Sequence, residues 1–131
     1  MTSEPPRRGE LYFAELEEIG RKLVLVVSSD RVNELLTPLV CLVTATQRER
    51  SLATFVPLDP PEGGVWRPSA ILCHNVVTLE AWRFATAPIG AVSEATMQLV
   101  NAALQRVFDL GSVEPTDDVP ADPTPEADAT E

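Results

Sequence analysis

Residues 8–30 of the chain read RGELYFAELEEIGRKLVLVVSSD, and this stretch decides the fold. Its first part, from Gly9 to Glu15, is rich in aromatic residues and predicts a strand. The run from Leu23 to Val27 is continuously aliphatic and of strand length, which is typical of a central strand buried on both faces. Between them, residues 17–20 predict a short turn that ends on a glycine. We therefore expect the fold to be built mainly from β-structure.

Further short strands are predicted after this stretch. Residues 31–34 favour a single helical turn, and residues 59–64, which read DPPEGG, indicate a strong turn. The last predicted strand belongs at a sheet edge, because Pro88 cannot donate a ladder hydrogen bond. The predicted strands beyond residue 30 cover residues 37–45, 52–58, 69–77 and 83–89.

One helix closes the predicted domain. Ser93 is a good N-cap, Glu94 places negative charge in the first turn, and Gly111 follows the end. Apolar residues recur at spacings of three and four, so one helix face should pack on the sheet. These residues are Met97, Val100, Ala103, Leu104 and Val107. The pattern predicts a mainly β fold, a small curled barrel of about six or seven short strands with a C-terminal helix.

Charge is divided unevenly along the chain. The whole sequence of 131 residues has a net charge of −10, but seven acidic residues and no basic ones follow Gly111. Residues 1–111 therefore carry 13 acidic and 10 basic side chains, a net charge of −3. We expect a flexible N-terminal arm (1–8), one folded domain (9–111) and a disordered acidic tail (112–131). The tail lacks the apolar residues that would offset its ordering entropy.

The cysteines and the single histidine point away from metal chemistry. Cys41 and Cys73 each lie in an aliphatic run, which favours two buried thiols in a reducing compartment over a disulfide. His74 is the only histidine, and no paired ligand spacing accompanies it, so we expect no metal and no cofactor. The polar N-terminus has no apolar signal region, and no run approaches the ~18 apolar residues of a membrane span. We expect a cytoplasmic protein.

The order of the segments resembles a known family. The RGELYF opening is followed by LVLVVSSD, then by VCLVTATQ, by RPSAIL and by the helix with Ala102, Ala103 and Leu104. Together these segments are similar to the MazF/PemK family of toxin endoribonucleases from bacterial toxin–antitoxin pairs. The resemblance implies an SH3-like barrel and a homodimer. It also implies metal-free cleavage of single-stranded mRNA at short sequences, and inhibition by a cognate antitoxin.

The resemblance also implies a site. The family's catalytic arginine and threonine positions fall on Lys22 and Thr44, with Arg21 and Thr46 as substitutes. Because successive strand side chains face opposite ways, Arg21 and Lys22 cannot both serve unless the backbone bulges there. The predicted substrate-binding residues are Arg48, Arg50, His74 and Asn75.

The chemistry of metal-free RNA cleavage sets what these residues must do. The neighbouring 2′-hydroxyl is the nucleophile, and the phosphate oxygens need a cation or hydrogen-bond donors. Lys22 would hold the phosphate or protonate the leaving oxygen, and Thr44 would donate its hydroxyl. Trp66 and Trp82 could stack bases, although packing in the core or in a dimer is the favoured interpretation of both.

Three departures from the family pattern leave a second hypothesis open. Position 22 is a lysine, Leu23 stands where the family has proline, and Val77 stands where a cation is expected. A catalytically impaired protein of the same fold would bind RNA or an antitoxin without cleaving. A gyrase-poisoning toxin on the same scaffold is a third hypothesis. The acidic tail is predicted to compete locally with RNA, against the simpler role of a solubilising segment.

Overall fold

A single six-stranded sheet organises residues 4–46 and 52–110, the part of the chain that the computed structural model describes. The strands are antiparallel and lie in the order β4-β5-β3-β2-β1-β6. The strands are β1 Glu10–Leu16, β2 Gly20–Val26, β3 Leu39–Ala45, β4 Phe55–Leu58, β5 Ser69–Thr78 and β6 Gly90–Ala91. The helices are α1 Asp30–Leu35, α2 Glu94–Phe108 and two 3₁₀ turns, η1 Glu62–Gly64 and η2 Ala81–Arg83. The mainly β fold with a C-terminal helix is confirmed.

Strands β1 and β2 form a hairpin, and β2 lies at the centre of the sheet beside β3. The register of the hairpin pairs Leu11 with Leu25 and Glu15 with Arg21. The turn between the strands uses positive φ at Glu18 (78°) and Gly20 (83°), and the glycine adopts that conformation without a Cβ penalty. Residues 24–26 are fully buried. The predicted central strand is therefore confirmed, although it begins at Gly20 rather than at Leu23.

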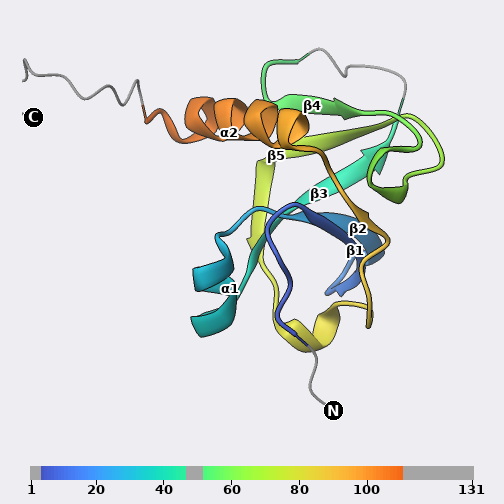
Figure 1. The fold of residues 1–131 in the computed structure, drawn as a ribbon, viewed down its shortest axis with the longest axis vertical. Helices are drawn as coiled ribbons and strands as arrows, with labels where there is room; N and C mark the ends of the chain where they lie inside the picture. The colour runs from blue at the N-terminus through green and yellow to red at the C-terminus, as the bar shows by residue number, and fades with distance from the viewer. Residues whose placement is uncertain (1–3, 47–51, 111–131) are drawn as a thin grey trace, which may run out of the picture.

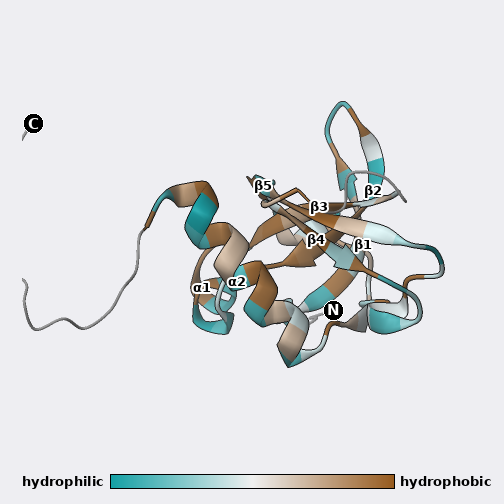
Figure 2. Cartoon of the chain, turned by 90° about the horizontal axis from the view of Figure 1, so that it is seen from above, coloured by the Kyte–Doolittle hydropathy of each residue, from teal (hydrophilic) through white to brown (hydrophobic). Residues whose placement is uncertain are grey.

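The curled sheet buries apolar residues on both faces, because alternate side chains along each strand point to opposite sides. We call the face that packs against α2 the inner face. Its core holds Leu11, Leu25, Cys41, Ile71, Val100 and their neighbours. The outer face holds Tyr12, Ala14, Val24, Val26, Val40 and Leu79. Apolar residues accordingly concentrate on the strands in Figure 2.

Helix α2 lies along β4 and β5 (Figure 1). The Ser93 side chain caps it by accepting from the Thr96 N–H at 3.1 Å, as predicted. Its apolar face joins the inner core, which confirms the predicted packing. The helix ends earlier than Gly111 suggested, because Asp109 adopts the left-handed C-cap conformation with φ of 54°. Gly111 lies outside the described residues.

The strand predicted over residues 83–89 is wrong. This segment runs beside β1, but only Ala85 and Ile89 donate backbone bonds to it, at 2.8 Å each, to Phe13 and Leu11. Residues 81–83 instead form η2, and regular pairing is restricted to the two residues of β6. Pro88 has no N–H to contribute to the ladder, which interrupts the strand.

The structure describes both cysteines and part of the N-terminal segment. Cys41 and Cys73 are free and fully buried, as expected. Residues 4–8 of the predicted arm are described, and Arg8 donates to Asp30, to the Val27 carbonyl and to Asn101. The predicted tail, residues 112–131, lies outside the described residues. No helix within residues 4–46 and 52–110 is long and apolar enough to cross a membrane.

Candidate active site

Lys22 and Thr44 are placed by the β2–β3 ladder. Its register pairs Leu23 with Val43 and Val24 with Leu42. The ladder ends at the Leu23–Val43 pair, and Lys22 and Thr44 are the next residue on each strand. We therefore infer that the two predicted catalytic residues lie near each other, although they are 22 positions apart in the sequence.

Both side chains lie on the outer face. Val24 and Leu42 belong to the outer apolar cluster, and Lys22 and Thr44 lie two residues further along the same strands, so they point the same way. Both are exposed. Their other strand neighbours are alanines, because Ala14 pairs with Lys22 and Ala70 pairs with Thr44.

The pair presents its polar groups to solvent. Within the described ranges, no hydrogen bond or ion pair to the Lys22 ammonium or the Thr44 hydroxyl is seen. An ammonium and a hydroxyl that lie near each other can contact two different oxygens of the same phosphate. The catalytic role of the two residues stays a prediction, and the geometry is compatible with it.

The substitutes lie elsewhere. Arg21 points to the inner face, and its guanidinium carbon lies 4.6 Å from the centroid of the Phe13 ring. It therefore cannot take the place of Lys22, as the alternation of strand side chains predicted. Thr46 lies just beyond β3, where its N–H donates to the Pro68 carbonyl at 3.0 Å.

The predicted substrate-binding residues are not brought together with the pair. His74 and Asn75 lie in a β-bulge, because the register jumps so that Cys41 faces Val76 while Leu42 faces Leu72. His74 stacks on the Phe55 ring with centroids 5.4 Å apart. It lies four residues along β5 from the Thr44 partner Ala70, roughly 13 Å at the usual strand rise. Arg48 and Arg50 lie outside the described residues.

A small pocket opens on the inner face, behind the pair. Its volume is about 170 Å³. Arg67 and Trp66, which form part of its wall, precede β5. Arg21 does not line this pocket, but its guanidinium lies over the ring of Phe13, which does. We call it the Trp66 pocket, and its lining residues are Phe13, Leu23, Val43, Ala45, Val65, Trp66, Arg67 and Ser69. The sequence did not predict this pocket. Its one signal was the RPS sequence of residues 67–69, which places the cation Arg67 just before a strand.

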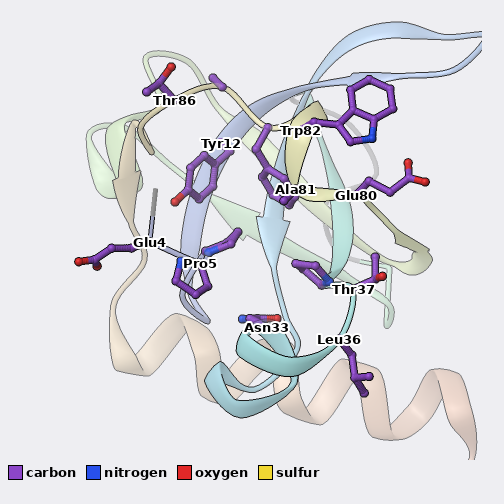
Figure 3. A pocket seen from close by; sticks show the side chains of 14 residues that line it. Glu4, Pro5, Tyr12, Asn33, Leu36, Thr37, Glu80, Ala81, Trp82 and Thr86 are labelled. Carbon is purple, nitrogen blue, oxygen red and sulfur yellow. The ribbon is translucent and has the colours of Figure 1, made fainter. Parts of the chain in front are cut away.

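A larger pocket of about 590 Å³ lies between the N-terminal segment, α1 and η2 (Figure 3). Tyr12 forms part of its wall, and its hydroxyl donates to Glu10 at 3.0 Å. Burial and that carboxylate raise the pKa of Tyr12 well above its usual range. The ionisable residues in its described lining, apart from Tyr12, are Glu4 and Glu80, with no Lys or Arg. This pocket is therefore poorly suited to a phosphate.

In the described part of the chain, no three His, Cys, Asp or Glu side chains gather as metal ligands. The fold is a curled antiparallel sheet with a C-terminal helix, and Lys22 and Thr44 are exposed on its strands β2 and β3. The chain belongs to the family of PemK-like, MazF-like toxins of type II toxin–antitoxin systems, whose family model matches residues 7–108. The resemblance predicted from the sequence is confirmed.

Individual relatives agree with this assignment. Endoribonuclease EndoA of Bacillus subtilis is 33% identical over 106 residues, which cover 76% of this chain and 90% of that protein. The probable endoribonuclease MazF5 of Mycobacterium tuberculosis is 31% identical and covers 79% of this chain and 94% of its own length. A mycobacterial endoribonuclease solved in complex with its cognate antitoxin superposes with a TM-score of 0.71 at 27% identity, covering 82% and 98% of the two chains.

Proposed function

We propose that the protein is a toxin endoribonuclease that cleaves single-stranded mRNA at short sequences without a metal. The proposal rests on two exposed residues, Lys22 and Thr44, which follow the last β2–β3 ladder pair, Leu23 and Val43, on their strands. Relatives named endoribonucleases at 31–33% identity support the same activity.

The cleavage step is internal transesterification. The 2′-oxygen attacks the adjacent phosphorus and its proton passes to a base, while the bond from phosphorus to the 5′-oxygen breaks. The leaving oxygen takes up a proton, so the products are a 2′,3′-cyclic phosphate and a 5′-hydroxyl. Lys22 offsets the charge that develops on the phosphate oxygens, and Thr44 donates a hydrogen bond to one of them.

The lysine at position 22 changes how the phosphate is held. An ammonium is a compact point charge, whereas the guanidinium expected from the family would donate two parallel hydrogen bonds. Lys22 would therefore still stabilise the phosphate charge, but it would orient the phosphate less strictly than an arginine. Leu23 is half buried on the inner face beside the Trp66 pocket. The leucine that replaces proline therefore does not contact the proposed phosphate position.

We further propose a cytoplasmic homodimer that a cognate antitoxin inhibits. A relative of this fold has been solved with its cognate antitoxin. The apolar run of residues 36–43 suits a dimer interface only in part, because Leu36 is 70% exposed while Cys41 is fully buried. Leu36 and the preceding Leu35, which is 63% exposed, are available for contact with a second copy.

A cleavage assay tests the proposed activity. The purified full chain is incubated with a single-stranded RNA, and with the same RNA as a duplex, in the presence of a chelator. We expect cleavage of the single strand only, with a cyclic phosphate on the new 3′ end. If a folded protein gave no products at high concentration but still bound the RNA, the impaired, binding-only hypothesis would replace this one.

A further inference from the structure

We propose that the Trp66 pocket holds one base of the RNA, next to the phosphate at Lys22 and Thr44. The proposal rests on the proposed function for the identity of the ligand. It assigns Phe13, Trp66, Arg21 and Arg67 to substrate binding, and the sequence pattern placed none of them at a common site.

The walls and floor of the pocket suit a flat ring. Trp66 is 63% exposed, and its ring centroid lies 5.9 Å from that of Phe13, with the planes tilted by 41°. The floor includes the buried residues Val43 and Val65. A large indole left in solvent beside an apolar floor gains from covering by another aromatic group, and base stacking on such side chains is sequence-tolerant.

The charges at the rim favour a nucleotide over an uncharged aromatic ligand. Arg21 lies over Phe13, and Arg67 is exposed in the pocket wall. Glu15 faces Arg21 across the β1–β2 ladder, so the rim carries two cations against one carboxylate. Arginines beside aromatic rings contact both the phosphate and the face of a stacked base.

The pocket and the catalytic pair occupy two sides of the same strand ends. Arg21 precedes Lys22 on β2, and Ala45 follows Thr44 on β3. Neighbouring residues on a strand face opposite ways, so one nucleotide that turns around these ends can reach both faces. Its phosphate would lie on the outer face, with its base in the Trp66 pocket.

The second tryptophan provides a matched control. Trp82 is 72% exposed, and the Arg83 guanidinium carbon lies 4.3 Å from its ring centroid, so it repeats the pairing of an indole with an arginine. However, Trp82 lines the larger pocket with Glu4 and Glu80. It also lines a small neighbouring pocket with Phe13 and Arg21, but it does not line the Trp66 pocket. Removing this indole should therefore weaken RNA binding less than removing Trp66.

Fluorescence and binding test the assignment without cleavage. In the Trp82→Phe variant, Trp66 is the remaining tryptophan. We titrate it with a single-stranded oligonucleotide of a cleaved sequence whose 2′-hydroxyls are methylated. We expect saturable quenching of Trp66, and about tenfold weaker binding by the Trp66→Ala variant, since this change removes the ring on which the base stacks. Trp66→Phe should restore most of the affinity, and Trp82→Ala should weaken binding clearly less than Trp66→Ala does.

An oligonucleotide with one abasic position locates the base. Moving the abasic position along the strand should reveal one place at which Trp66→Ala no longer weakens binding. Equal affinity of Trp66→Ala and Trp82→Ala, or unchanged Trp66 fluorescence at saturation, would overturn the proposal. Quenching by the methylated strand without cleavage of natural RNA would support the base site and refute the nuclease. If the Trp66→Ala variant cleaved RNA normally with an unchanged KM, the nuclease would be supported and the base site refuted.

Discussion

The surroundings of Lys22 differ from those of its neighbour Arg21, and the proposed phosphate site depends on this difference. The Lys22 side chain pairs with the small Ala14 across the β1–β2 ladder, and Thr44 follows the last residue of β3 that pairs with β2. Arg21 is adjacent in sequence but points into the other face. A basic side chain at position 22 therefore lies on the same side of the sheet as Thr44, and one at position 21 does not.

Substitution of Lys22 should separate charge from geometry. We expect Lys22→Gln to lower the cleavage rate about 100-fold, because it removes the charge that offsets the developing phosphate charge. Lys22→Arg should retain the rate or exceed it, since the guanidinium adds a second parallel hydrogen bond. Single-turnover cleavage of a labelled RNA measures both variants. A Lys22→Gln enzyme with wild-type rates would remove Lys22 from the mechanism.

Glu62 links η1 to the start of α2 and gives stability a pH dependence. Its carboxylate accepts from the Ser93 N–H at 2.9 Å and the Thr96 hydroxyl at 2.6 Å. Burial alone would raise the pKa of Glu62, but these hydrogen bonds outweigh it and lower that pKa below its ordinary value of 4.5. Because the folded-state pKa is lowered, the contribution is present above the unfolded-state pKa and is lost as pH falls through the folded-state pKa.

We expect Glu62→Gln to lower the free energy of unfolding by about 1 kcal/mol at pH 7. The difference from the wild type should shrink as the pH falls below 4.5, where the wild-type carboxylate begins to protonate. Urea unfolding at several pH values measures it. A deficit that stays constant down to acid pH would show that Glu62 acts through packing alone.

At the scale of elements, periodic residue patterns in the sequence predict strands and helices. They do not predict where a strand is interrupted. The β1–β2 pair and α2 were predicted because aromatic, aliphatic and helical periodicities are local properties of the chain. Residues 83–89 were mistaken for a strand, although they share only scattered bonds with β1. The bulge that carries His74 depends on pairing with β3 and β4, which no local pattern records. The Trp66 pocket likewise draws its residues from several elements, so only the curled sheet reveals it.

The packing of α2 can be tested by two adjacent residues. Val100 is fully buried in the inner core, whereas Leu99 is 54% exposed. We expect Val100→Ala to lower the free energy of unfolding by about 2 kcal/mol through the cavity it leaves. Leu99→Ala should change it by less than about 0.5 kcal/mol. Chemical denaturation measures both. If Leu99→Ala were the more damaging change, the helix would bury a different face, or Leu99 would lie in a dimer interface.

At the scale of the whole molecule, charge is segregated between the domain and the C-terminal residues. Residues 1–111 have a net charge of −3, and the seven acidic residues that follow account for the rest of the −10. An acidic segment tethered to an RNA-binding domain competes at a high effective concentration. We propose that residues 112–131 weaken RNA binding in this way.

Truncation after Gly111 should strengthen RNA binding several-fold at low salt, and the gain should vanish at high salt, where charges are screened. A matched variant keeps the full length but replaces the seven acidic residues by Asn and Gln. It should bind like the truncated chain, because charge and not length is responsible. Equal RNA affinity of all three proteins at low salt would leave the tail a solubilising role only.

If Lys22 and Thr44 act together on one phosphate, their contributions to cleavage are coupled, and a double-mutant cycle measures that coupling. Cleavage rates are measured for the wild type, Lys22→Ala, Thr44→Ala and the double variant, with circular dichroism confirming that each is folded. We expect each single change to reduce the rate, and the double change to cost less than the two losses combined, with a coupling energy of at least about 1 kcal/mol. Losses that simply add, or a Thr44→Ala enzyme as fast as the wild type, would contradict a shared phosphate.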